Sequence, residues 1–454
     1  MNALRLFITI LLFCYPANLL AQTDALLHTI EDRAILFQNV NLVTMDDESV
    51  QYGMDLLVEG DRISRIAPIG EIYAPHGATV INGNGRNYLM PGLAEMHGHV
   101  PPMESGERWP ERYLEDVLFL YLAGGVTTVR GMLGHPNQLE LKEMVNNNAI
   151  AGPTLYLAGP SFSGNTIRSE DDARERVKIQ AEEGWDLLKI HPGLSTDQYR
   201  AMAETANELG MEFSGHVPAE VGLEMAAKLG QRTVDHLDGY IEYIGAMEQP
   251  VTDEQLQKAI DLTLEHDIWV VPTQALWKTL LGAADHEKLM QYDEIKYMPQ
   301  NVINGWKSYL ENQQNTFFYR GEYAAVHAEN RQKLLNGLNV AGANILLGTD
   351  APQIFSVPGL AMRHELAIME EAGLSPYDVI RSGTYNVGKY FKEKDNFGTL
   401  TEGSRADLVM TEQNPLENLD TIMSHHGVVV RGYWIPREKI DEKLAEIEEA
   451  YRAN

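Results

Sequence analysis

Six side chains that could bind a metal ion stand at the ends of short apolar segments in this chain of 454 residues. His97 and His99 are separated by one residue, so in an extended strand both imidazoles point to the same face and can bind one cation. The other ligand candidates follow separate apolar runs: Lys189, His216, His236 and Asp350. A buried lysine or aspartate at such a position needs a partner of opposite charge. The joint pattern therefore predicts a metal site rather than a set of unrelated core residues.

The N-terminal residues have the pattern of a secretory signal peptide. Arg5 precedes an apolar stretch from Leu6 to Phe13, and Ala21 follows at a suitable cleavage point. The apolar stretch is too short to span a bilayer as a stable anchor. We therefore expect residues 1–21 to be a signal peptide. The mature protein would be exported, periplasmic or secreted, with no stable membrane association.

Cysteine usage and charge restrict the chemistry. The only cysteine, Cys14, lies inside the expected signal peptide, which excludes disulfides and thiolate ligands from the mature chain. Any metal must then be held by nitrogen and oxygen, which suits Zn²⁺ and, as alternatives, Mn²⁺, Co²⁺ or Fe²⁺. The formal net charge of −29 disfavours nucleic acid as a partner. We expect a small-molecule or dipeptide substrate, and the sequence leaves a homo-oligomer open.

Two β-rich segments flank a long middle in which strands and helices alternate. Residues 30–90 and 395–434 contain short strand patterns, and Glu59-Gly60-Asp61 separates two alternating runs, which is a hairpin signal. Residues 91–394 alternate about eight short apolar runs with longer helical patterns, which predicts an α/β fold, a (β/α)8 TIM-type barrel. We expect the flanking segments to form one small β-sandwich domain. The ligand candidates would lie at the carboxyl ends of the barrel strands, where barrel enzymes carry their active sites.

Two further segments fall outside this alternation. An insertion at about residues 280–324 is rich in polar and aromatic residues and too long for an ordinary loop, and it is either lid-like or a peripheral helical excursion. Residues 435–454 have the pattern of a charged C-terminal helix.

The motifs around the ligand candidates resemble those of the amidohydrolase superfamily. PGLAEMHGHV is similar to the family's first barrel strand, GHVP and DHLDG to the fifth and sixth, and GTDAP to the eighth. GTLTEGSRADLVM resembles the return of the chain into a β-sandwich domain. The resemblance covers nearly everything after the signal peptide. It points to a secreted branch near imidazolonepropionase-like hydrolases, prolidase-type metal-dependent dipeptidases and ochratoxin-hydrolysing amidases.

The resemblance implies a binuclear metal centre, most suitably of zinc. The two strand-one histidines would bind one ion, His216 and His236 the other, and a carboxylated Lys189 would bridge them. Asp350 would bind metal and act as the proton shuttle for a metal-bridged hydroxide. Modification of the lysine by CO₂ would replace an unpaired ammonium by an anion that the metal ions neutralise.

Other positions bear on the surroundings of the centre. Glu95 and Gly131 stand where the family pattern usually has aspartate. Tyr240, four residues after a ligand histidine, could polarise the substrate carbonyl or pack in the core. His135 could bind a substrate carboxylate, and His364 either contacts substrate or supports Asp350 from behind.

The implied reaction is hydrolysis of an amide C–N bond in a dipeptide or an N-acyl amino acid type of substrate. A cyclic-amide hydrolase or deaminase, or an ester or organophosphate hydrolase, could use the same site. Lys189 argues against the first of these, because mononuclear members usually lack a bridging lysine. A non-catalytic exported protein that binds metal or another ligand is the alternative from a different class. Asp350 argues against it, because a storage site needs no proton shuttle.

Overall fold

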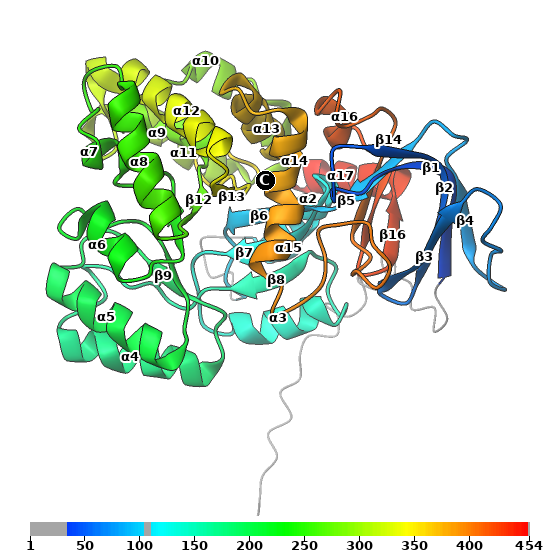
Figure 1. The fold of residues 1–454 in the computed structure, drawn as a ribbon, viewed down its shortest axis with the longest axis horizontal. Coiled ribbons are helices and arrows are strands. Elements are labelled where there is room, and N and C mark those ends of the chain that lie inside the picture. Colours follow the sequence, from blue (N-terminus) through cyan, green and yellow to red (C-terminus); the bar gives the residue numbers. More distant parts are fainter. Residues whose placement is uncertain (1–33, 104–109, 453–454) are drawn as a thin grey trace, which may run out of the picture.

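The computed structural model describes residues 34–103 and 110–452. The expected signal peptide lies outside the described residues. No helix in these two ranges combines the length and the apolar character needed to cross a membrane. Figure 1 shows a β-rich part, built from both ends of the chain, beside a larger part in which helices surround a curled set of strands.

The β-rich part is one eight-stranded sheet with the order β16-β15-β14-β5-β1-β2-β3 and with β4 paired to β1. Its strands are β1 (Ala34–Val43), β2 (Val50–Glu59), β3 (Arg62–Pro68), β4 (Thr79–Asn82), β5 (Tyr88–Pro91), β14 (Leu408–Thr411), β15 (Gly427–Val430) and β16 (Tyr433–Pro436). The antiparallel pair β5 and β14 joins the two ends of the chain, with Met90 opposite Val409. Phe37, Val40 and Leu408 pack in one buried cluster, so each segment supplies part of the other's apolar core.

The turn between β2 and β3 shows how the sequence sets a register. Gly60 and Asp61 form a two-residue loop between the paired residues Glu59 and Arg62. Gly60 has a φ of +60°, which glycine adopts without steric cost and which hairpin loops of this length require.

The middle of the chain contains strands that pair in parallel. They are β6 (Leu93–Gly98), β7 (Val126–Gly131), β8 (Thr154–Leu157), β9 (Leu188–Ile190), β10 (Phe213–Gly215), β11 (Thr233–Asp235), β12 (Trp269–Val271) and β13 (Asn344–Ile345). Three form the sheet β6-β7-β8 and five form the sheet β13-β12-β11-β10-β9. Ala158 and Leu187 form a parallel bridge between the two sheets, and the Met96 N–H donates to the Leu347 carbonyl at 2.8 Å at their other edges. This is an α/β fold consistent with the TIM-barrel superfamily.

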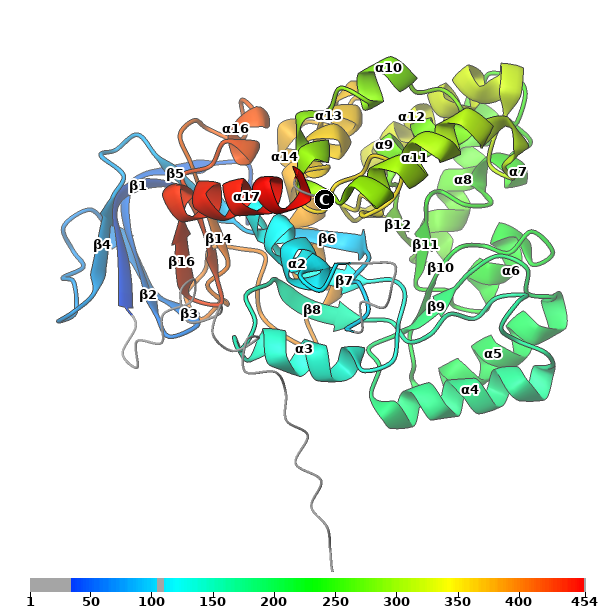
Figure 2. The same ribbon diagram turned by 180° about the vertical axis from the view of Figure 1, so that it is seen from behind.

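Helices connect these strands and cover them on the outside (Figures 1 and 2). The longer ones are α2 (Tyr113–Ala123), α3 (Gln138–Asn146), α4 (Glu170–Glu183), α5 (Thr196–Leu209), α6 (Gly222–Lys228), α8 (Asp253–Glu265), α9 (Gln274–Leu281), α12 (Ala324–Val340), α13 (Met362–Glu371) and α14 (Pro376–Gly383). Short helices are α7 (Tyr240–Tyr243), α15 (Tyr385–Tyr390) and α16 (Asp420–Met423).

Residues at the helix ends determine where the following strands begin. Ser169 caps α4, and Ser195 and Gln198 form a capping box at the start of α5. Gly184 and Gly210 end these helices in the left-handed conformation, with φ of +88° and +67°. The chain therefore leaves each helix sharply and enters β9 or β10 within a few residues, which aligns the ends of neighbouring strands.

The insertion folds into α10 (His286–Leu289), a 3-10 turn η1 (Asp293–Tyr297), α11 (Gln300–Asn312) and the short turns η2 (Gln313–Asn315) and η3 (Gly321–Tyr323). Trp306 of α11 packs on Phe355, with ring centroids 5.4 Å apart. The last helix, α17 (Arg437–Arg452), lies beside α2, where the Tyr451 hydroxyl donates to Asp116 at 2.6 Å (Figure 2). The insertion and the C-terminal helix are thus both attached to the helical shell.

Candidate metal centre and active site

His97 and Asp235 form the inner part of the site. His97 lies on β6 and Asp235 ends β11, and both are buried. The Nδ1–H of His97 donates to Asp235 Oδ2 at 2.7 Å. This bond fixes the ring orientation and leaves the Nε2 lone pair for a metal ion. Arg130, at 3.3 Å, supplies the positive charge that the buried Asp235 carboxylate needs.

The other two buried histidines among the ligand candidates are oriented in the same way. His216 Nδ1 bonds Asp238 Oδ2 at 2.6 Å, and His236 Nδ1 bonds Thr273 Oγ1 at 2.8 Å. His236 Nε2 is buried and has no hydrogen-bond partner in the described part of the chain. An unpaired nitrogen of this kind costs free energy unless a ligand occupies it. Burial lowers the pKa of His236, so the imidazole is neutral, which is the form that binds metal.

Lys189 lies on β9 and is completely buried. Its Nζ is 3.2 Å from His97 Nε2. Within the ranges that the structure describes, no carboxylate forms an ion pair with it. Burial lowers the pKa of Lys189 to about 8, because a buried ammonium is poorly solvated. A fraction of the Lys189 side chains is therefore neutral near neutral pH, and the neutral amine is the form that reacts with CO₂.

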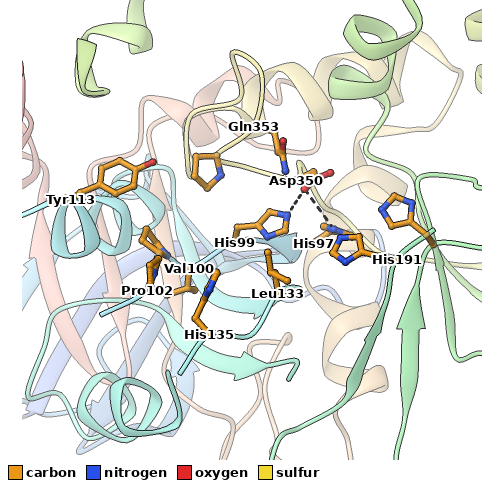
Figure 3. Close-up of a pocket in the computed structure, with 13 residues that line it drawn as sticks. His97, His99, Val100, Pro102, Tyr113, Leu133, His135, His191, Asp350 and Gln353 are labelled. Carbon is orange, nitrogen blue, oxygen red and sulfur yellow. Dashed lines mark hydrogen bonds and ion pairs between the residues drawn. The ribbon is translucent and has the colours of Figure 1, made fainter. Parts of the chain in front are cut away.

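Asp350 connects the first histidine pair to His236. Its Oδ1 lies 2.6 Å from His99 Nε2 and 3.6 Å from His97 Nε2, and its Oδ2 lies 3.8 Å from His236 Nε2. Figure 3 shows His97, His99 and Asp350 pointing toward one another at one end of a cavity. Asp350 and His236 both have positive φ, 61° and 64°. Non-glycine residues seldom adopt this conformation, and it often occurs at functional sites.

The structure thus brings all six sequence-predicted ligand candidates together. The ring centroids of His97 and His236 are 4.3 Å apart, and those of His216 and His236 are 4.5 Å apart. Ligand atoms of His97, His99 and Asp350 lie within 4.8 Å of one another, close enough to hold one ion. Converging nitrogen and oxygen donors, three of them on rings fixed through Nδ1, fit a divalent metal such as zinc.

The two departures from the family pattern have local explanations. Glu95 is buried and accepts the backbone N–H of His97 at 3.0 Å and that of Thr349 at 2.8 Å, together with the Thr349 hydroxyl. It therefore ties β6 to the segment that carries Asp350, and burial raises its pKa to about 8. A Cβ atom at Gly131 would lie 2.6 Å from Leu157 Cδ2, so a larger side chain would require this leucine to shift.

A cavity of about 500 Å³ opens over the centre. Its lining residues are His97, His99, Val100, Pro101, Pro102, Tyr113, Leu133, His135, His191, His216, Asp350, Pro352 and Gln353. His135 is among them, as expected for a substrate contact. Burial, with some repulsion from His99, lowers the pKa of His135 and favours its neutral form.

The other two sequence-predicted substrate contacts are placed elsewhere. Tyr240 is fully buried, and its hydroxyl bonds Thr263 Oγ1 at 2.7 Å, away from the cavity. His364 Nε2 bonds Glu294 Oε1 at 2.5 Å, and the ring stacks on Tyr292. Tyr240 therefore packs in the core, which is one of the two positions that the sequence left open for it. His364 links α13 to the insertion through Glu294 and Tyr292, and support of Asp350 by His364 stays a prediction.

Sequence analysis did not identify several residues that surround the centre. His191 lines the cavity and stacks on His216 with centroids 5.4 Å apart. It stands two residues after Lys189, and the same spacing that identified the first histidine pair would have found it. Asp235 and Asp238 flank His236 in the sequence, but their bonds to distant imidazoles carry no sequence signal.

Residues 88–435 match the amidohydrolase family, so the chain belongs to this family. It is accordingly a hydrolase that acts on carbon–nitrogen bonds. An ochratoxinase of Aspergillus niger is 22% identical over an alignment 406 residues long, which covers 75% of this chain and 73% of that protein. The solved structure of a bottromycin amidohydrolase matches with a TM-score of 0.74 at 20% identity and covers 95% of this chain and 93% of that one. A Xaa-Pro dipeptidase with bound methionine matches with a TM-score of 0.67 at 18% identity, covering 89% of this chain and 100% of that one.

Proposed function

We propose that this chain hydrolyses an amide C–N bond in a dipeptide or an N-acyl amino acid, and that it uses two divalent metal ions to do so. The observation that carries the proposal is the convergence of four imidazoles, Lys189 and Asp350 around one point, with three of the imidazoles fixed through Nδ1. An amide-hydrolysing relative and the fold of a dipeptidase support the choice of substrate class.

The residues that would hold the metal ions are the six that converge. His97 and His99 would bind one ion, His216 and His236 the other, and a carboxylated Lys189 would join them. Bound metal ions would polarise the substrate carbonyl and lower the pKa of water at the site. The bonds from Asp235, Asp238 and Thr273 keep three of the rings in position for this task.

Asp350 would move the proton. Its carboxylate faces three imidazoles and lies on the cavity surface, so it can accept a proton at Oδ1 or Oδ2 from the attacking water and deliver it to the leaving amine. His135 and Tyr113 line the same cavity away from the ligands, where they could orient the substrate.

We also propose that the parallel strands β6 to β13 close into a (β/α)8 barrel and that the eight-stranded sheet forms a composite β-sandwich domain. The bridge between Ala158 and Leu187 and the hydrogen bond between Met96 and Leu347 support closure, because they connect both free edges of the two parallel sheets. This would place every ligand at the carboxyl ends of strands, as barrel enzymes require. Export through a signal peptide ending at Ala21 remains a proposal from the sequence pattern, and N-terminal sequencing of the exported protein tests it.

A substrate panel tests the proposed function. Purified protein is analysed for metal by mass spectrometry and then incubated with dipeptides and N-acetyl amino acids, and the released amine is measured. We expect two metal ions per chain and turnover of at least one compound class. Two bound ions with no turnover across the panel would contradict the proposal and favour a binding protein. One bound ion with ammonia release from cyclic or heterocyclic substrates would favour a deaminase.

A further inference from the structure

A second cavity, of about 730 Å³, lies behind His216 and His236. Asp238, which is bonded to His216, lines it, and the rings of Trp277 and His236 have centroids 5.5 Å apart. His216 itself lines the first cavity, so the pair of His216 and Asp238 separates the two spaces. The insertion contributes Phe317 and Phe318 to the wall of the second cavity. This space therefore adjoins the candidate metal centre on the side away from His99 and His135.

The inner wall of this cavity carries the charged Arg331 side chain, which forms no ion pair with a carboxylate in the described part of the molecule. Arg331 is 2% exposed. Its side-chain nitrogens donate to the His236 and Pro272 carbonyls and to the Gln274 side chain, which are all uncharged, in the described part of the molecule. The guanidinium also lies 4.8 Å from the centre of the Trp277 ring. A buried charge that bonds only to neutral groups is poorly compensated, so a ligand anion would stabilise it.

Three buried polar atoms in the same wall have no hydrogen-bond partner within the described ranges. They are Trp277 Nε1, Arg320 Nε and His327 Nδ1, and all three side chains line the cavity. The indole and guanidinium nitrogens can only donate, so each needs an acceptor. Buried donors left without partners cost free energy, and native proteins contain few of them. Trp277 and Arg320 thus each lack an acceptor in this wall, and one ring nitrogen of His327 lacks a partner in the described ranges.

The nearby acidic residues compensate this wall only in part, because Asp238, Glu242 and Glu365 attract the Arg331 charge without forming an ion pair with it in the described structure. Asp238 is bonded to His216, while Glu220, Glu224 and Glu242 are exposed at the solvent side. Glu224 is paired with Lys228 as well. Arg331 therefore lies at the buried end of the cavity, while the three glutamates lie at its rim.

The remaining surface of the cavity is apolar and aromatic. Val217, Leu223 and Leu237 line it next to the strand ends, and Phe317 and Phe318 close it from the insertion. Phe317 is 75% exposed, and its ring packs edge-on against Phe318 with centroids 5.4 Å apart. A pocket with apolar walls and a few fixed donors suits a bulky apolar group that bears one anionic group.

We propose that this second cavity binds the part of the amide substrate that carries a free carboxylate beside a bulky apolar side chain. The carboxylate accepts hydrogen bonds from Arg320 and from the Trp277 indole and faces the Arg331 charge, while the apolar group packs on Val217, Leu237 and the phenylalanines of the insertion. The proposal rests on the proposed amide hydrolysis, since it assigns one half of that substrate to this space.

The experiment measures binding rather than turnover, with 3-phenylpropanoate as probe and the neutral 3-phenylpropan-1-ol as its analogue. Calorimetry is carried out on the full metal-loaded chain. We expect the carboxylate to bind at least about tenfold more tightly than the alcohol, since a hydrogen bond to a charged group is worth that much. Trp277→Phe and Arg320→Gln should each weaken binding of the carboxylate about tenfold and leave binding of the alcohol nearly unchanged.

Trp434→Phe, in the eight-stranded sheet, and Arg174→Gln, on exposed α4, are the matched controls and should change neither affinity. Arg320→Gln decides the question if Trp277→Phe unfolds, because Arg320 is partly exposed and bonds only to neighbouring carbonyls in the described chain. Equal binding of the two probes would overturn the proposal. So would loss of carboxylate binding on metal removal with no effect of either substitution, because the probe would then bind the metal ions. Absence of turnover on the substrate panel with intact probe binding would instead count against the proposed reaction alone.

Discussion

The imidazole of His97 and the carboxylate of Asp235 are joined by a hydrogen bond of 2.7 Å, and both side chains are shielded from solvent. Asp235 also accepts from the Thr233 hydroxyl at 2.6 Å and from Arg130 at 3.3 Å. His216 has a counterpart in Asp238, but this aspartate is partly exposed and bonds only the imidazole in the described structure. Two carboxylates therefore perform one orienting task in very different surroundings.

This contrast predicts different effects of two identical substitutions. Asp238→Asn should weaken metal binding about 10- to 100-fold, because the ring of His216 loses its anionic partner, with little loss of stability. Asp235→Asn should weaken metal binding similarly and also lower the free energy of unfolding by about 3–5 kcal/mol, because the buried Arg130 loses its nearest counter-charge and keeps only Glu212 at 3.9 Å. Metal titration and urea unfolding measure the two effects. Equal stability losses for both variants would contradict this assignment.

The buried amine predicts a dependence of metal content on Lys189. Lys189→Ala should lose most of the bound metal and reduce activity at least about 100-fold, because the anion proposed to join the two ions is removed. Short carboxylic acids such as acetate or propionate should restore part of the metal content and part of the activity, since they can occupy the space of the missing side chain. Lys178→Ala, on the exposed face of α4, is the control. Full metal content in Lys189→Ala would show that the amine is not a ligand.

The convergence of the ligand candidates could be predicted from sequence because its signals are local. The spacing of His97 and His99 follows from the two-residue period of a strand, and Asp350 joins them because parallel strands end at one edge. The position of Tyr240, in contrast, could not be predicted from local spacing. The chain turns sharply after His236, where Leu237 and Gly239 also have positive φ, and this turn directs Tyr240 into the core.

Contacts between distant parts of the chain could not be predicted. The Asp235 carboxylate reaches an imidazole that is 138 residues away in sequence, and nothing near either residue indicates the pairing. The second cavity depends in the same way on the path of the insertion, which brings Arg320 and Phe318 to a wall formed by Trp277 and Arg331. Composition identified this segment as aromatic but not which surface its side chains meet.

The position of Asp350 predicts that its role is chemical rather than structural. Asp350→Asn keeps the shape of the side chain and one oxygen for a metal ion, but the amide cannot carry the proton. Turnover should fall about 10²- to 10⁴-fold, with a much smaller change in KM. Steady-state kinetics and metal analysis check this, with the exposed Asp171→Asn as control. A normal kcat at normal metal content would remove the proton-transfer role.

His425 predicts a pH dependence of stability that is separate from the metal centre. It is buried between the eight-stranded sheet and α2, where Nε2–H donates to the Ala123 carbonyl at 2.9 Å and Nδ1 has no partner in the described chain. Burial lowers its pKa from 6.5 to about 4. Between these values the unfolded chain binds a proton that the folded chain does not, so the folded state loses stability as pH falls, by up to about 3 kcal/mol at pH 4.

His425→Gln cannot take up this proton but can still donate to Ala123. At pH 7 the variant should be less stable than the natural chain by about 1 kcal/mol, because the amide fills the site less well. The difference in unfolding free energy should shrink and then reverse as pH falls below 6.5, since only the natural chain carries the cost of protonation. Urea unfolding at several pH values measures this difference. The titration of all other groups contributes equally to both chains and therefore cancels. His76→Gln, which replaces an exposed histidine, is the matched control. A constant difference across this pH range would mean that His425 is protonated as easily in the folded chain as in the unfolded one.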